Sequence, residues 1–187
     1  MAISRIAKAG VFSVCMWAAA SACAQAEVDW TSPLGVKLGA TSCRQVQRQK
    51  RQTWDLWTKY VSEVTGGMAF YPEKAVVDDL PGLRRLVIVC DQEQGKVAAV
   101  FLVLPRKVMK DAATGFTSRF ATVQSHFSDP LQGDGLWRDE TDYVTINYDE
   151  RHGDTFDLTF MTEDFQRRAA EYAGKNPRAP AWYEPPY

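Results

Sequence analysis

The sequence predicts an α+β fold, in which helices pack on one face of an antiparallel sheet built from hairpins. Two observations support this prediction. Two pairs of apolar, β-branched runs each flank a short polar turn that contains glycine, which is the pattern of a β-hairpin. Each pair follows a segment whose apolar residues recur every three or four positions, as on one face of an amphipathic helix. Because this order occurs twice, we also expect two fused helix-plus-hairpin units within a single domain, at residues 27–110 and 111–174.

The first 26 residues have the three parts of a secretory signal peptide. Arg5 and Lys8 provide positive charge, residues 9–22 are largely apolar and uncharged, and small residues end the segment at Ala26. The apolar stretch is shorter than the roughly 20 residues that span a membrane. We therefore expect cleavage after Ala26, which leaves a folded domain over residues 27–174.

Two other interpretations of this segment stay open. In one, the segment is kept as a membrane anchor. In the other, the chain is a lipoprotein, because residues 20–23 resemble the lipobox whose cysteine, here Cys23, becomes the acylated first residue, although lipoboxes prefer leucine in place of Ala20. A cleaved chain is expected in the periplasm or outside the cell, and a lipid-anchored one at the outer membrane, facing the periplasm. Both place the folded part in an oxidising compartment, with no transmembrane span after cleavage.

Charge is nearly balanced along the chain, which has 22 basic and 23 acidic residues. Because the leader carries two of the basic residues and no acidic one, the mature chain is only slightly acidic. This balance argues against nucleic acid or anionic lipid as a partner. The local basic cluster of Arg44, Arg48, Lys50 and Arg51 is interpreted as the solvated face of a helix rather than as a phosphate-binding patch.

Two cysteines, Cys43 and Cys90, lie outside the leader. In an exported protein this pair predicts a disulfide bond, because disulfides persist outside the reducing cytosol. The alternatives are a catalytic thiol and a metal site. The chain has no CxxC motif and only two histidines, which is a poor set of metal ligands, so we expect neither a metal nor another cofactor.

The first unit is predicted to begin with a helix over residues 43–64, for which Thr41 and Ser42 are both suitable N-cap residues. The polar stretch 47–52 is either an exposed part of this helix or a break between two shorter helices. After it, four apolar residues continue the helical spacing: Trp54, Trp57, Val61 and Val64. Strands at 86–90 and 97–104 then form a hairpin around a polar turn.

The second unit is predicted to begin with a helix over residues 113–127. Its apolar stripe consists of Phe116, Phe120, Val123 and Phe127. A hairpin of strands 143–148 and 156–160 follows, with a short additional strand at 136–138. Thr162 then caps a last helix with an acidic first turn, where the helix dipole favours negative charge.

A resemblance to known proteins starts at residues 35–41, Gly-Val-Lys-Leu-Gly-Ala-Thr, which precede the predicted helical residues 43–46. This stretch resembles the G-x-x-L-G-x-T opening of many small exported bacterial domains, similar to the β-lactamase inhibitor protein and to the small lipoprotein of the outer-membrane β-barrel assembly machinery. Those domains place a helix pair before a short antiparallel sheet. The resemblance implies a non-catalytic protein-binding module. The family helix usually closes with a Leu-Gly pair, whereas polar residues 47–51 follow here, and no family binding residue is carried over.

Residues that catalysis would need are sparse. His126 and His152 are the only histidines; the first is placed at the end of the second helix and the second in a charged hairpin turn. Side chains of the acidic pairs Asp78-Asp79 and Asp139-Glu140 would point to opposite faces of a strand, which suits acid–base chemistry poorly. The motifs of serine hydrolases, zinc proteases, P-loops and dinucleotide-binding folds do not occur.

Aromatic residues are the better candidates for partner binding, because they are enriched at binding hot spots. The candidates are Trp54 and Trp57 in the first predicted helix, and Trp182, Tyr183 and Tyr187 in the tail. The tail, residues 175–187, holds four of the nine prolines and is expected to be extended. In the alternative interpretation, the tail folds back and its aromatic residues pack on their own domain.

Together these features predict an exported, non-catalytic protein-binding module of the bacterial envelope, such as an inhibitor or immunity protein or an accessory of envelope assembly. Its partner is expected to be another envelope or exported protein. Two alternatives stay open: a small periplasmic hydrolase that uses carboxylates, and a carrier of a small ligand in a cavity beneath the sheet.

Overall fold

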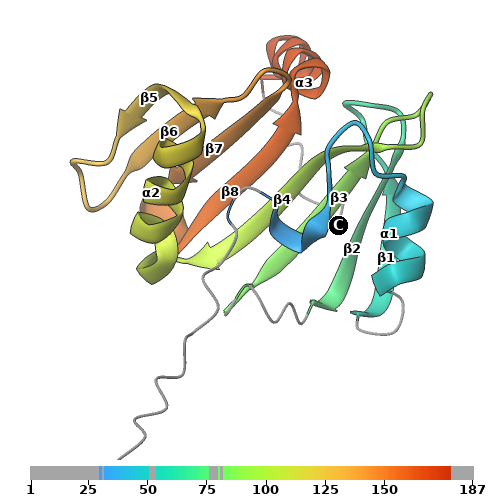
Figure 1. Ribbon diagram of the computed structural model, residues 1–187, viewed down its shortest axis with the longest axis horizontal. Helices are drawn as coiled ribbons and strands as arrows, with labels where there is room; N and C mark the ends of the chain where they lie inside the picture. Colours follow the sequence, from blue (N-terminus) through green and yellow to red (C-terminus); the bar gives the residue numbers. More distant parts are fainter. Residues whose placement is uncertain (1–29, 31, 51–53, 76–79, 81, 178–187) are drawn as a thin grey trace, which may run out of the picture.

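The part of the chain that the structure describes forms one antiparallel sheet of eight strands with three α-helices, which confirms the predicted α+β class (Figure 1). The computed structural model describes residues 30, 32–50, 54–75, 80 and 82–177. The strands follow the order β1-β2-β3-β4-β8-β7-β6-β5, so that two four-stranded meanders meet where β4 pairs with β8.

A helix followed by four strands occurs twice along the chain. The first set consists of α1 Cys43–Lys50, β1 Trp54–Val61, β2 Met68–Ala75, β3 Arg85–Cys90 and β4 Val97–Pro105. The second set consists of α2 Met109–Arg119, β5 Ala121–His126, β6 Gly133–Arg138, β7 Asp142–Tyr148 and β8 Thr155–Thr162, and α3 Glu163–Lys175 comes last. Both predicted hairpins and the short strand near residues 136–138 are therefore present.

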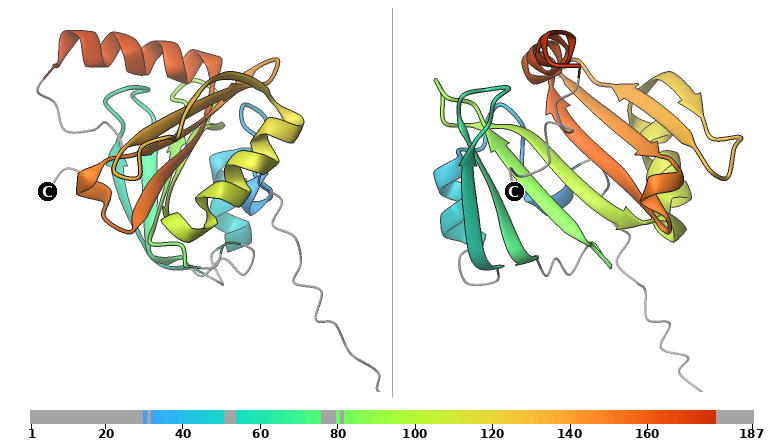
Figure 2. Two further views of the ribbon diagram at one scale, coloured as in Figure 1. Left: turned by 90° about the vertical axis from the view of Figure 1, so that its left-hand side faces the viewer. Right: turned by 180° about the vertical axis from the view of Figure 1, so that it is seen from behind.

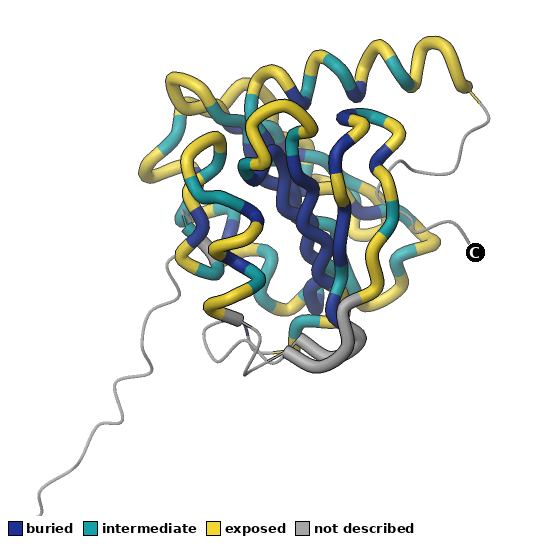
Figure 3. Tube along the Cα trace, turned by 90° about the vertical axis from the view of Figure 1, so that its right-hand side faces the viewer, coloured by how far each residue is buried: buried dark blue, intermediate teal, exposed yellow. Residues whose placement is uncertain are grey.

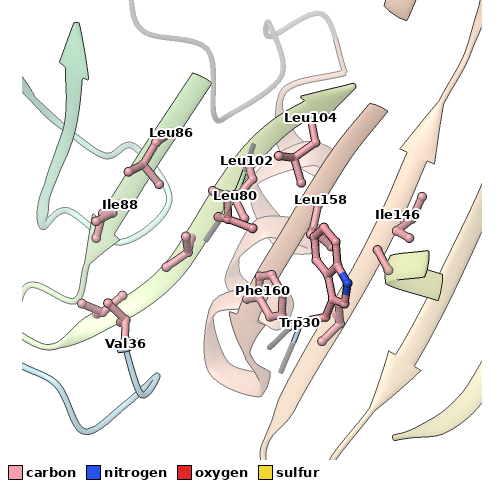
Figure 4. Packing of buried hydrophobic residues seen from close by; sticks show 14 of the residues in the cluster. Trp30, Val36, Leu80, Leu86, Ile88, Leu102, Leu104, Ile146, Leu158 and Phe160 are labelled. Atoms are coloured by element: carbon pink, nitrogen blue, oxygen red, sulfur yellow. The ribbon is translucent and has the colours of Figure 1, made fainter. Parts of the chain in front are cut away.

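The two faces of the sheet bury separate apolar clusters, because side chains alternate along each strand. On one face, α1 and α2 pack on the larger cluster, which includes Trp30, Val46, Ile88, Leu102, Phe116, Trp137 and Phe160 (Figure 4). On the other face, Phe165 and Ala169 of α3 pack on Ala99, Phe101 and Met161. The buried residues concentrate in the middle strands, as Figure 3 shows.

The prediction that the helices lie on one face therefore holds for α1 and α2 and is wrong for α3 (Figure 2). The cause is the connection between β8 and α3. Thr162 ends β8 and caps α3 directly, accepting a hydrogen bond from the Phe165 N–H at 3.2 Å. With no loop between them, α3 folds onto the face where the Phe165 ring lies 6.0 Å from that of Phe101.

The predicted helix over 43–64 is wrong beyond Lys50, because residues 54–61 form β1. The spacing of the apolar residues there fits a helix, but the segment Trp-Asp-Leu-Trp-Thr-Lys-Tyr-Val is also rich in aromatic and β-branched residues, which favour strands. Pairing with β2, from Trp54 opposite Ala75 to Val61 opposite Met68, decides between the two.

The predicted helix over 113–127 is wrong beyond Arg119, because residues 121–126 form β5. The break lies at Phe120, whose backbone is extended while its N–H still closes the helix on the Phe116 carbonyl at 2.8 Å. The rings of these two residues keep the edge-on contact that the helical spacing suggested. The rest of the apolar stripe belongs to a strand.

The predicted disulfide between Cys43 and Cys90 is confirmed. It joins the first residue of α1 to the last residue of β3, and both cysteines are buried in the larger cluster. The Cys43 N–H also donates to the Gly95 carbonyl at 2.9 Å, so the start of α1 is held on the β3–β4 turn. Because the linked residues are 47 positions apart, the bond closes a long loop of the unfolded chain.

Replacing Cys90 with serine is expected to lower the free energy of unfolding by on the order of 4 kcal/mol, the chain-entropy value for a loop of this length. Urea denaturation in oxidising buffer measures the loss. The double variant Cys43→Ser, Cys90→Ser and the reduced natural chain serve as controls and should be similarly weakened. An unchanged urea midpoint in Cys90→Ser would contradict a stabilising role of the bond.

Gly135 is expected to reject a side chain, because a Cβ there would lie 2.5 Å from the Trp137 ring and 2.6 Å from the Phe127 ring. Gly135→Ala should lower stability by about 1–3 kcal/mol through overpacking. The control is Gly174→Ala near the end of α3, where nothing lies within 4 Å and alanine favours the helix. Thermal melting should separate the two variants, and equal melting temperatures would contradict the packing at Gly135.

Candidate functional site

A row of polar side chains crosses four strands on the face of the sheet that also carries α3. In register, His126 of β5 lies opposite Asp134 of β6, Asp134 opposite Asn147 of β7, and Asn147 opposite Asp157 of β8. Residues directly opposite each other point to the same face, so these four form one line. Asn147 is exposed although β7 lies inside the sheet, because α3 packs nearer the other end of the strands.

An open cleft of about 710 Å³ lies over this row. Thr145 and Thr159, one row closer to α3, also line it. Its walls come from the β5–β6 connection, residues 127–132, and from the β7–β8 turn, residues 149–154. The cleft is therefore the uncovered end of one sheet face, enclosed by two hairpin loops.

His152 enters the cleft from the β7–β8 turn and is held between two carboxylates. Its Nε2 lies 3.1 Å from Asp157 Oδ2, and its Nδ1 lies 2.8 Å from Asp149 Oδ1. The backbone nitrogen of Asp149 also lies 3.0 Å from Nδ1, within the capping box of the short turn Glu150–His152. Only 17% of the His152 side chain is exposed.

The electrostatics of this cluster favour its charged forms. Burial alone would lower the pKa of His152, but the hydrogen bonds to Asp157 and Asp149 outweigh it, so the pKa is raised. The pKa of Asp149 is held well below its usual range, first by the Arg151 guanidinium, whose nitrogens lie 2.5 and 2.8 Å from Oδ2, and then by His152.

These contacts leave His152 without a ring nitrogen for proton transfer to a ligand. Each nitrogen already faces a carboxylate oxygen, so the ring fastens the turn to Asp157. A general base needs a nitrogen within reach of the proton that it removes. The interpretation of residues 149–154 as a charged hairpin turn is therefore correct, and His152 has a role in positioning that turn.

His126 lies in β5, so its predicted position at the end of a helix is wrong. Its side chain is 71% exposed, and Nδ1 lies 3.5 Å from Asp134 Oδ2. The same oxygen accepts a hydrogen bond of 2.5 Å from Gln124 Nε2. Asp134 thus links two neighbouring side chains of the edge strand to the floor of the cleft.

The edge strand β5 is the second unusual feature of this end of the molecule. All six of its residues are exposed, and Val123 is 55% exposed. It is the last strand of the sheet, paired with β6 on one side only, with an irregularity between Thr122 and Gln124. Its outer backbone groups are therefore open to another chain.

Most of the residues predicted from the sequence to bind a partner lie outside this region or outside the described residues. Trp54 and Trp57 belong to β1, at the opposite edge, and their side chains are outside what the structure describes. The same holds for Trp182, Tyr183 and Tyr187 of the tail and for Cys23 of the leader. The structure thus brings none of these candidates into the cleft.

The acidic pairs also fall elsewhere. Asp139 and Glu140 are exposed in the β6–β7 turn, away from the residues that line the cleft, and Asp78-Asp79 lies outside the described residues. Of the basic cluster, Arg44 and Arg48 are exposed on α1, as predicted. Within the described part of the chain, no three His, Cys, Asp or Glu side chains are grouped so that they could hold a metal ion.

Asp134, Asn147 and Asp157 were not identified as site residues from the sequence. A signal for two of them existed, because they occupy the polar positions of the alternating strands 143–148 and 156–160. That alternation shows which residues share a face, but not that α3 leaves this end of the face uncovered. The sequence contains no such signal for β5 as an exposed edge strand, because Val123 fits the apolar stripe of a helix equally well.

The chain matches no protein-family profile, and no similar curated protein or solved structure was found. Among the described helices, none has the length and apolar character required to cross a membrane.

The pH dependence of stability tests the clamp around His152. Since the folded state raises the pKa of His152, its contribution to stability is complete below the usual histidine pKa of about 6.5 and is lost as the pH rises through the folded value. His152→Asn should therefore cost about 2 kcal/mol at pH 6 and less at pH 9, as measured by urea denaturation.

His126→Asn is the matched control. Because the His126 ring is 71% exposed, this variant should change the free energy of unfolding little at either pH. A constant difference between His152→Asn and the natural chain from pH 6 to pH 9 would show that the charge of the ring does not stabilise the turn.

Proposed function

We propose that this chain is an exported, non-catalytic protein-binding module of the bacterial envelope, and that it binds its partner at the β5 edge of the sheet. The exposure of all six β5 residues is the observation that carries the proposal. An open edge strand offers a row of unpaired N–H and C=O groups to which an extended segment of another protein can add as a further strand.

The composition of β5 supports its use as a binding edge. Natural sheets often protect an exposed edge with lysine, proline or a bulge. The strand Ala-Thr-Val-Gln-Ser-His contains neither lysine nor proline, and its irregularity interrupts the pairing only between Thr122 and Gln124. Leu131, in the loop after β5, is also 56% exposed, so apolar contact area lies beside the open backbone.

Export to the envelope is supported by the leader-like first 26 residues and by the Cys43–Cys90 bond. Disulfides of this kind are typical of proteins outside the cytosol. An envelope protein without catalytic machinery acts through what it binds, which agrees with the resemblance to small exported binding domains.

The two alternatives have less support. A hydrolase that used His152 as its general base would need a free ring nitrogen, whereas both nitrogens of His152 already contact carboxylates. A carrier of a small ligand in a cavity beneath the sheet would need an enclosed cavity, whereas this cleft is open.

Site-specific photo-cross-linking tests the proposal. A photoreactive amino acid in place of Val123 should give a stoichiometric adduct with a single protein in living cells or periplasmic extract. The matched control is Val61, which is 62% exposed and lies on β1 at the opposite edge of the sheet. No adduct at Val123, or equal adducts at both valines, would contradict binding at the β5 edge.

A further inference from the structure

We infer that the segment which adds to β5 is a basic one, and that a lysine or arginine of this segment lies over the cleft and pairs with Asp134. This inference rests on the proposed function, because it assumes that a partner strand occupies the β5 edge. It goes further by assigning the charge of the partner segment and the residue that recognises it.

The register of the sheet places the added strand next to the cleft. Neighbouring strands lie about 4.8 Å apart, so a strand beyond β5 continues the row that runs from Asp157 through Asn147 and Asp134 to His126. A side chain of the added strand on this row stands beside His126, whose ring is 71% exposed. Only a long side chain crosses β5 and reaches the Asp134 carboxylate.

The charge of the cleft favours a cation in that position. Among the described residues that line it are four aspartates, Asp129, Asp134, Asp149 and Asp157, whereas the positive groups that face them are Arg151 and the His152 ring. Arg151 is already paired with Asp149. The cleft as a whole is therefore negative, and it attracts a basic side chain.

Asp134 is the carboxylate best placed to take the cation. Within the described residues its polar side-chain partners are Gln124 and His126, neither of which carries a permanent positive charge. Its side chain is 39% exposed, so an incoming guanidinium or ammonium group meets it without the full cost of desolvation. Asp157, by contrast, lies deeper and already holds His152.

The same charge argues against a second copy of this chain as the occupant. The strand β5 of another copy, Ala-Thr-Val-Gln-Ser-His, contains no lysine or arginine, so it does not supply the cation that the acidic cleft favours. The occupant is therefore a different protein with a basic extended segment.

Synthetic peptides test the inference directly. The probe is a fluorescent eight-residue peptide of alternating threonine and valine with one lysine at a central position, compared with the same peptide carrying glutamine or glutamate there. The lysine peptide should bind the full-length mature chain most tightly and the glutamate peptide least. Fluorescence anisotropy measures the affinities, and amide shifts of β5 in NMR spectra locate the binding.

Asp134→Asn should weaken binding of the lysine peptide about fivefold and leave the glutamine peptide unchanged. The matched control is Asp139→Asn, at an exposed carboxylate in the β6–β7 turn outside the cleft, which should bind all three peptides as the natural chain does. Asp129→Asn provides a second cleft variant with a weaker effect. Circular dichroism confirms that each variant is folded.

The outcomes separate this inference from the proposed function. Equal affinities for the three peptides, no effect of Asp134→Asn, no peptide binding at all, or self-association of the chain through β5 would each overturn the inference. If one of these results is found but the Val123 cross-link to another protein still forms, the proposed function stands. Only the basic charge assigned to the partner segment is then wrong. If that cross-link fails as well, both are wrong.

Discussion

The pairing of β4 with β8 is the interaction on which the rest of the structure depends. It joins two four-stranded meanders through seven residue pairs, from Ala99 opposite Met161 to Pro105 opposite Thr155. Eight of the nine residues of β4 are buried, so the centre of the sheet needs cover on both faces. The helices α1 and α2 cover one face and α3 covers part of the other, which leaves a polar area at one end of the α3 face, where Asn147 and Asp157 lie.

In each half of the sheet, the last residue of the third strand holds a neighbouring segment in place, but the two halves use different interactions. Cys90 ends β3 and is bonded to Cys43 of α1, while Tyr148 ends β7 and its hydroxyl donates to the Asp129 carbonyl at 2.8 Å. The Tyr148 ring also stacks on Phe127 and carries the Arg106 guanidinium 4.4 Å above it. A covalent bond thus holds a helix in the first half, and packing holds the β5–β6 connection in the second.

The sequence predicted the elements that are determined locally and missed those that depend on distant pairing. Both hairpins, the capped helix α3 and the disulfide follow from alternation, a cap residue and a cysteine count. The apolar residues of β1 and β5 fit the helical period as well as the strand period, and only the partner strands decide between the two. The alternation in the sequence indicates that the polar residues of the cleft share one face of the sheet. It does not indicate where α3 packs, so it does not show that this part of the face is open.

The position of the cleft agrees with a gradient of polarity along the strands. On the α3 face, β8 carries Asp157, Thr159 and Met161 in order toward α3, and β7 carries Asn147 and then Thr145 in the same direction. At this end of the α3 face, β7 and β8 thus present the polar side chains of Asn147 and Asp157. A polar or charged partner group can enter this end of the sheet without any rearrangement of the core, whereas α3 cannot be displaced without exposing Phe101 and Met161. The binding that we propose is therefore confined to the β5 side of the cleft.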